Sequence, residues 1–120
     1  MTTSTAVDEL FAKRDPVARA IYDRLLAKLK SVGAVKAEPN KSSIHLVAGS
    51  DGSAFGGVHP RKSGILLNVR TDARIDNERV RKVEQVSRSR FHNEMLLDSP
   101  DDVDDELIAW LRDAYALAKK

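Results

Sequence analysis

The most distinctive chemistry in this chain lies in a set of cations that fall at the ends of apolar stretches. Between His59 and Arg90, nine Lys or Arg residues stand against four Asp or Glu residues, a net charge of +5, whereas all 120 residues together carry only +2. Guanidinium and ammonium groups that converge bind phosphate or carboxylate oxygens through charge-assisted hydrogen bonds. The sequence therefore predicts an anion-binding surface formed by Lys41, Arg61, Lys62, Arg70 and Arg90.

A second interpretation of these cations needs no ligand, because Lys and Arg also keep the edges of a sheet from pairing with other chains. The segment His59–Thr71, HPRKSGILLNVRT, is typical of a hairpin corner. A phosphate loop is excluded there, because the residues after Gly64 predict a strand and not a helix. The ligand interpretation requires that several of these cations gather on one surface of the sheet, and the order of the strands determines which of them do.

Carboxylates dominate the next part of the chain, with six in residues 98–106 and no cation among them. Hard divalent cations bind several carboxylate oxygens. This run, however, opens a helix, where negative charge is favourable, and it lacks the glycine-bearing spacing of a calcium loop. We therefore expect a structural role for these acids, with no metal and no cofactor.

The three histidines, His45, His59 and His92, all fall on predicted strands. Histidines on adjacent strands can bind zinc, but this spacing matches no zinc signature, so ordinary sheet residues are expected. A histidine beside a carboxylate in a pocket between helices and sheet would instead make a small enzyme, and this alternative stays open. Because the chain has no cysteine, disulfides and thiolate sites are excluded.

Two long amphipathic helices frame the chain. Asp15-Pro16 is a cap followed by proline, and apolar residues at helical spacing predict a helix over residues 16–32 that ends at Gly33. Ser99-Pro100 repeats this signal before the stripe Val103, Leu107, Trp110, Leu111, Ala114 and Leu117.

Between the helices the apolar period indicates strands over residues 43–48, 53–59, 65–70 and 91–97, with a short edge strand over 35–38. Asp51-Gly52 is typical of a tight hairpin turn. Residues 72–89 predict either a short helix or an irregular crossover. The fold class is therefore α+β, with two layers: a mainly antiparallel sheet of four to five strands and both long helices packed on one face.

Length and composition bound the rest. We expect one domain over residues 1–120, with residues 1–6 forming a disordered tail. No apolar run spans a bilayer, and the first residues resemble no export signal, so a cytoplasmic protein without membrane contact is expected. Either a monomer or a homodimer is compatible with the sequence.

Several motifs occur in a recognisable order: FAKRDP before the first long helix, KSSIHL, HPRKSGILLNV, RFHNEMLLDSPDDVDDEL and WLRDAY. Together, from about Phe11 to Tyr115, they resemble the bacterial family named domain of unknown function 5655. The resemblance implies a small α+β domain without an established activity, found alone or beside other domains, some of them nuclease-like. Residues that carry the resemblance and have no evident structural duty are Lys41, Lys62 and Arg90.

The leading functional hypothesis is a binding module whose basic sheet end contacts an anionic partner, either a nucleic-acid backbone or an acidic protein segment. A small histidine/carboxylate enzyme and a purely structural self-association domain are the alternatives. An enzyme is the less favoured of these classes, because no catalytic spacing stands out in the sequence.

Overall fold

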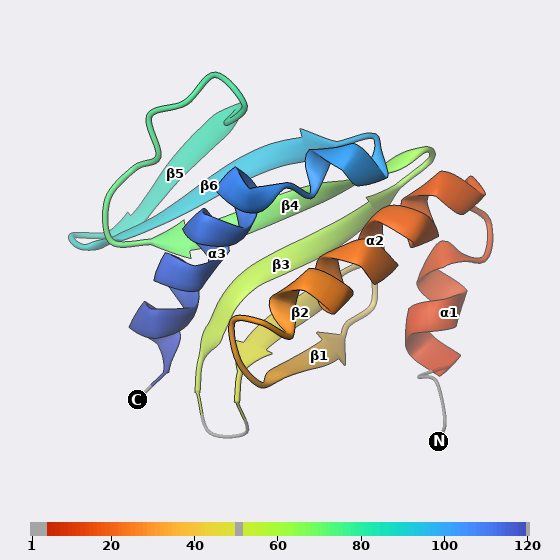
Figure 1. Cartoon of the computed structure of the whole chain (residues 1–120), viewed down its shortest axis with the longest axis horizontal. Coiled ribbons are helices and arrows are strands. Elements are labelled where there is room, and N and C mark those ends of the chain that lie inside the picture. Colours follow the sequence, from red (N-terminus) through yellow and green to blue (C-terminus); the bar gives the residue numbers. More distant parts are fainter. Residues whose placement is uncertain (1–4, 50–51, 120) are drawn as a thin grey trace.

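The computed structural model describes residues 5–49 and 52–119. Its helices are α1 (Thr5–Phe11), α2 (Pro16–Leu29) and α3 (Asp105–Ala118), with a 3-10 turn over Pro100–Asp102. The strands are β1 (Val35–Pro39), β2 (Ile44–Ala48), β3 (Ala54–Arg61), β4 (Gly64–Thr71), β5 (Lys82–Ser87) and β6 (Arg90–Leu97). All three helices lie on one side of the sheet (Figure 1).

The strands form one sheet in the order β1-β2-β3-β4-β6-β5, in which every neighbouring pair is antiparallel. The predicted α+β class, with an antiparallel sheet and a helix near each end, is confirmed. The predicted number of four to five strands is wrong, because the sheet has six. The expected short edge strand is β1, and β5 is the strand that the sequence did not predict.

The strand β5 was hidden in residues 72–89, where a helix or an irregular crossover was expected. Residues 72–81 form a connection without regular structure, and β5 follows it. Five of the six side chains of β5 are exposed, so the strand lacks the alternation of apolar and polar residues by which strands are recognised.

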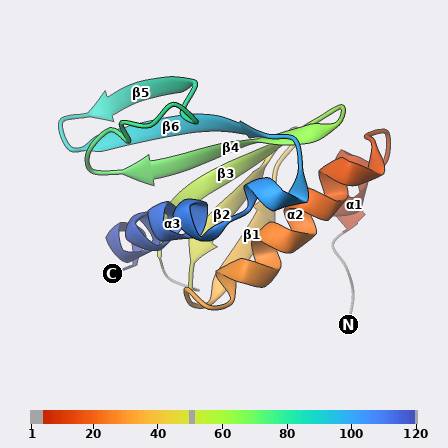
Figure 2. The ribbon, with the colours of Figure 1, turned by 45° about the horizontal axis from the view of Figure 1, so that its top comes forward.

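The core lies between the sheet and the two long helices (Figure 2). Alternate residues of β4, which are Ile65, Leu67 and Val69, are fully buried under α2 and α3. The helices contribute fully buried residues in return: Ala18, Ile21, Leu25, Leu29, Leu107, Leu111 and Ala114. One face of the sheet is thus covered, and none of the helices within residues 5–49 and 52–119 lies on the opposite face.

Both long helices are shorter than the apolar pattern predicts. α2 ends at Leu29 rather than Val32. The region after Ser99 forms a 3-10 turn, stabilised by a capping box between Ser99 and Asp102, before α3 begins at Asp105. Asp104 caps α3 by accepting a hydrogen bond from the backbone N–H of Leu107 at 3.0 Å. The acidic run therefore stabilises the start of this helix, as expected.

The N-terminal prediction needs a correction. Residues 1–6 were expected to be a disordered tail, but α1 already begins at Thr5, and Val7 and Phe11 are buried against the core. Residues 1–4, the predicted turn residues Ser50 and Asp51, and Lys120 lie outside the described residues. Within the described ranges, no helix is both long enough and apolar enough to cross a bilayer.

Candidate anion-binding face

The register of the strands determines which side chains share the uncovered face of the sheet. In β4, Ile65, Leu67 and Val69 point into the core, so Leu66, Asn68 and Arg70 alternate onto the other side. Their partners on β6 are Leu96, Glu94 and His92. We call this side the open face; it also carries His45, His59, Arg61, Lys82, Glu84, Arg90, Lys36 and Glu38.

Arg70 is the most unusual side chain of the open face. It is half-buried, and its Nε is inaccessible to solvent and has no hydrogen-bond partner within the described residues. Burial, reinforced by the nearby Arg90 guanidinium, lowers the pKa of Arg70. A desolvated guanidinium beside a second one is costly unless an anion compensates both.

His92 adjoins both arginines, because it is the cross-strand partner of Arg70 and lies two residues after Arg90 on β6. It is paired with Arg70 on one side and with Glu84 on the other. Burial and the positive charge of Arg70 lower the pKa of His92, although Glu84 acts in the opposite direction. The neutral imidazole is therefore favoured near neutral pH, and it offers a ring N–H donor and a flat surface.

Asn68 adds a second unsatisfied group to the same face. Its Oδ1 is buried and has no hydrogen-bond partner among the described residues. Asn68 lies two residues before Arg70 on β4, and its cross-strand partners are Gly57 on β3 and Glu94 on β6. Sequence reasoning missed Asn68, and the alternation in ILLNVRT was the only signal available for it.

The five predicted anion-binding residues do not gather at one end of the sheet. Lys41 and Lys62 lie in the β1–β2 and β3–β4 turns, and Arg61 ends β3, all at the end of the sheet where β6 finishes at Leu97. Arg70 and Arg90 lie at the opposite end, where β6 begins. The eight residues of β6 run from one end to the other, and the distance from its first to its last residue is about 23 Å at roughly 3.3 Å per residue. The reason is topological: β4 and β6 are long neighbouring strands that run in opposite directions.

The first of these ends is a basic corner. A surface hollow of about 380 Å³ lies beside the β3–β4 turn, lined by Arg61, Lys62, Ser63, Gly64, Arg81, Leu96 and Asp98. The backbone N–H of Asp15 donates to the carbonyl of Lys62 at 2.7 Å, which fixes the turn against the start of α2. The backbone of Gly64 runs so close to β6 that a Cβ there would lie 2.5 Å from the carbonyl oxygen of Leu97.

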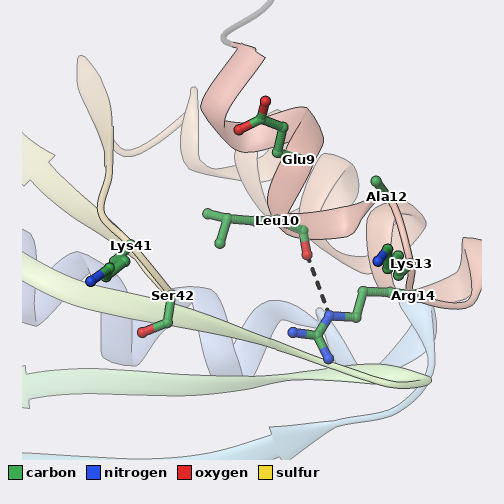
Figure 3. A pocket seen from close by; sticks show the side chains of 7 residues that line it. All are labelled: Glu9, Leu10, Ala12, Lys13, Arg14, Lys41 and Ser42. Atoms are coloured by element: carbon green, nitrogen blue, oxygen red, sulfur yellow. Dashed lines mark hydrogen bonds between the residues drawn. The ribbon is translucent and has the colours of Figure 1, made fainter.

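Lys41 lies on the other side of this corner, away from the open face. With Ser42 it lines a hollow of about 590 Å³, whose other lining residues belong to α1 and the turn after it: Glu9, Leu10, Ala12, Lys13 and Arg14 (Figure 3). There Arg14 Nε donates to the carbonyl oxygen of Leu10 at 3.3 Å. Lys41 therefore does not share a surface with Arg70 and Arg90.

All three histidines lie on the open face, on β2, β3 and β6, and not between helices and sheet. His45 is half-buried and has the Asn40 side-chain amide 3.4 Å from its ring, whereas His59 is exposed. Among the described residues, no three His, Asp or Glu side chains are grouped so that they could hold a metal ion.

Comparison with known proteins identifies one family. The model of the family described as "Domain of unknown function (DUF5655)" matches residues 7–118, nearly the whole chain, so the chain belongs to this family, as its motifs indicated. The searches of curated proteins and of solved structures each found no match.

Proposed function

We propose that this member of the DUF5655 family is a binding module whose open face contacts the phosphate backbone of a single-stranded nucleic acid. The observation that carries the proposal is Arg70, a half-buried guanidinium without a partner among the described residues and beside Arg90. A phosphate oxygen that approaches from the open side would accept hydrogen bonds from both guanidinium groups and offset their desolvation and repulsion.

The spacing of the cations supports an extended ligand. The pair Arg70 and Arg90 lies at one end of the open face, and Arg61 and Arg81 line the hollow at the other end. A single strand that crosses from one end to the other would meet Arg70, Arg90 and His92 at one end and Arg61 and Arg81 at the other. Between the two ends it would pass Asn68 and then His59. Histidine rings stack with unpaired bases, and an open antiparallel sheet is a common platform for them.

Phenylalanine does not contribute to such stacking. Phe55 is fully buried and forms an edge-on contact with Tyr115 in the core, and Phe91 alternates with His92 onto the covered side of β6. The proposal therefore predicts backbone-dominated binding with weak base preference.

Fluorescence anisotropy with labelled single-stranded DNA, single-stranded RNA and heparin at several salt concentrations tests the proposal. The variant Arg70→Gln, Arg90→Gln should bind at least about tenfold more weakly and should lower the salt slope by about two, one for each phosphate contact. Arg24→Gln is the matched control, because Arg24 is exposed on α2, on the helical side.

Three results would overturn the assignment: no binding to any nucleic acid at low salt, equal weakening by Arg24→Gln, or a salt slope unchanged in the double variant. Binding to polyglutamate without binding to nucleic acid would refute the nucleic-acid proposal and would indicate that the ligand of the open face is an acidic protein segment.

A further inference from the structure

The strand β1 forms one edge of the sheet and lies beside α2, and no other strand of the described residues pairs with its outer side (Figure 1). Its pairing with β2 is bracketed by two backbone hydrogen bonds, from Gly49 N–H to Ala34 C=O at 2.8 Å and from Asn40 N–H to Ser43 C=O at 2.6 Å. In an antiparallel ladder only every second residue bonds to the neighbouring strand. The residues of β1 that face β2 are therefore the even-numbered ones.

The odd-numbered residues turn their backbone groups away from β2. Val35 and Ala37 each present an N–H and a C=O to the free edge, and Pro39 presents a C=O alone. The position of Pro39 agrees with this assignment, because proline in an edge strand occupies an outward position where no N–H is needed. The free edge thus offers two donors and three acceptors over five residues.

An apolar groove runs along this edge. Its volume is about 480 Å³, and it lies between the last turns of α2 and the strand, with lining residues Leu26, Lys30, Gly33, Ala34, Val35 and Ala37. Leu26, Val35 and Ala37 pack against the core but stay partly exposed. An extended chain that pairs with β1 would cover these three side chains as well as the edge.

On the open side of β1, Lys36 and Glu38 form an ion pair with 3.3 Å between Nζ and Oε2. Their order along the strand makes β1 complementary to itself. When two copies of β1 run antiparallel with Ala37 opposite Ala37, Lys36 of each copy stands directly opposite Glu38 of the other. Opposite charges in such cross-strand pairs are stabilising.

We propose that β1 pairs with β1 of a second copy of this chain around a twofold axis at Ala37. The two Ala37 residues exchange both N–H to C=O hydrogen bonds, and Val35 N–H of each copy donates to Pro39 C=O of the other. With a twofold axis at Val35, neither Lys36 nor Glu38 would stand opposite a residue of opposite charge. With an axis at Pro39, the central pair would have no N–H donors, because proline has none. Charge and hydrogen bonding therefore both select the register at Ala37.

This interface is independent of the proposed nucleic-acid contact. Antiparallel pairing around an axis perpendicular to the sheet joins two six-stranded sheets edge to edge, with both helical layers on one side. The open faces of the two copies then form one continuous surface, which leaves Arg70 and Arg90 accessible in each copy.

Sedimentation equilibrium of the whole chain over a wide concentration range tests the proposal, and a monomer–dimer equilibrium is expected. Lys36→Glu places two acids opposite each other in both symmetric pairs and should raise the dimer dissociation constant about tenfold or more. Adding Glu38→Lys to this variant restores opposite charges across the interface and should recover dimerisation. Lys82→Glu, on β5 at the other edge of the sheet, is the matched control and should have no effect.

Ala37→Pro provides a second test, because it removes an N–H that points away from β2 and is not needed within one copy. The variant should keep the wild-type far-ultraviolet circular dichroism spectrum and sediment as a monomer. A wild-type chain that is monomeric at every concentration would overturn the proposal and leave the edge open to an unrelated peptide. So would a charge-swapped double variant no more dimeric than Lys36→Glu alone.

Discussion

Arg79 fastens the long connection between β4 and β5 to the start of α3 through Asp104. Its Nη1 donates to both carboxylate oxygens of Asp104, at 3.0 and 3.2 Å, and Nη2 donates to the carbonyl oxygen of Asp102 at 2.7 Å. The guanidinium also lies 5.7 Å from the ring centroid of Trp110 and forms an ion pair with Glu106. One side chain thus joins a connection without regular structure to a helix cap.

Arg79→Ala should lower the free energy of unfolding by about 2 kcal/mol, because hydrogen bonds to charged groups contribute about 1.5–3 kcal/mol each and those on the surface contribute less. Urea unfolding followed by circular dichroism measures the change. Arg74→Ala, at an exposed position of the same connection, should change stability by less than about 0.5 kcal/mol. Equal effects of the two variants would contradict the role assigned to Arg79.

The contribution of Asp104 should depend on pH in a defined direction. Burial acts to raise the pKa of Asp104, but the hydrogen bonds from Leu107 N–H and Arg79 outweigh it and lower that pKa. A carboxyl whose pKa is lowered by folding stabilises the folded state. This stabilisation is complete at pH values above the pKa of the unfolded state, about 3.9, and it is lost as the pH falls through the pKa of the folded state. The stability difference between wild type and Arg79→Ala should therefore shrink in acid. A difference that stays constant down to the lowest pH at which both unfold cooperatively would refute this coupling.

Arg70→Met should stabilise the unliganded protein while weakening any anion binding on the open face. The reason is that the substitution removes a half-buried charge without a partner in the described structure and keeps an apolar stem of similar length. A gain of about 0.5–1 kcal/mol in the free energy of unfolding is expected. Thermal and urea unfolding of the free protein measure it, and a loss of more than about 1 kcal/mol would show that Arg70 has a structural duty.

Asn93 should be among the least tolerant positions of the sheet. It is fully buried; its Nδ2 donates to Val69 C=O at 2.9 Å and to Thr71 Oγ1 at 2.8 Å, and its Oδ1 accepts from Ile75 N–H at 2.9 Å. Asn93→Leu leaves these groups without partners and should cost about 3 kcal/mol. Asn68→Leu is the matched control on β4, because the Oδ1 of Asn68 has no partner to lose. Similar costs for the two variants would contradict this account.

The elements with strong local signals were predictable from the sequence. Asp15-Pro16 and the stripe from Val17 to Leu29 encode α2, because proline at the first helical position and a helical apolar period act within a few residues. The strand β5 was not predictable, because Lys82–Ser87 is held by backbone pairing with β6 and buries almost no side chain. Pairing between segments is not visible in the pattern of one segment.

The candidate site shows the same limit. Arg70 and Arg90 were among the predicted residues, and their proximity follows from the pairing of β4 with β6, which the sequence left undetermined. Lys62 belongs to the other end of the sheet for the same reason. The local sequence pattern therefore indicated which Lys and Arg residues are candidates, whereas the order of the strands determines which of these candidates lie close together.

Because β5 buries few side chains, the two strands β4 and β5 of the open face should differ in local stability. β4 lies over the core, so its amides should exchange with solvent only when the whole domain unfolds, whereas β5 can separate from β6 without exposing the core. Amide hydrogen exchange should show this contrast between Val69 and Glu84. Arg70, the main residue of the proposed contact, therefore lies on a strand that stays folded as long as the domain does. Lys82 and Glu84 lie on β5, which can shift relative to β6 and so adjust to ligands of different width.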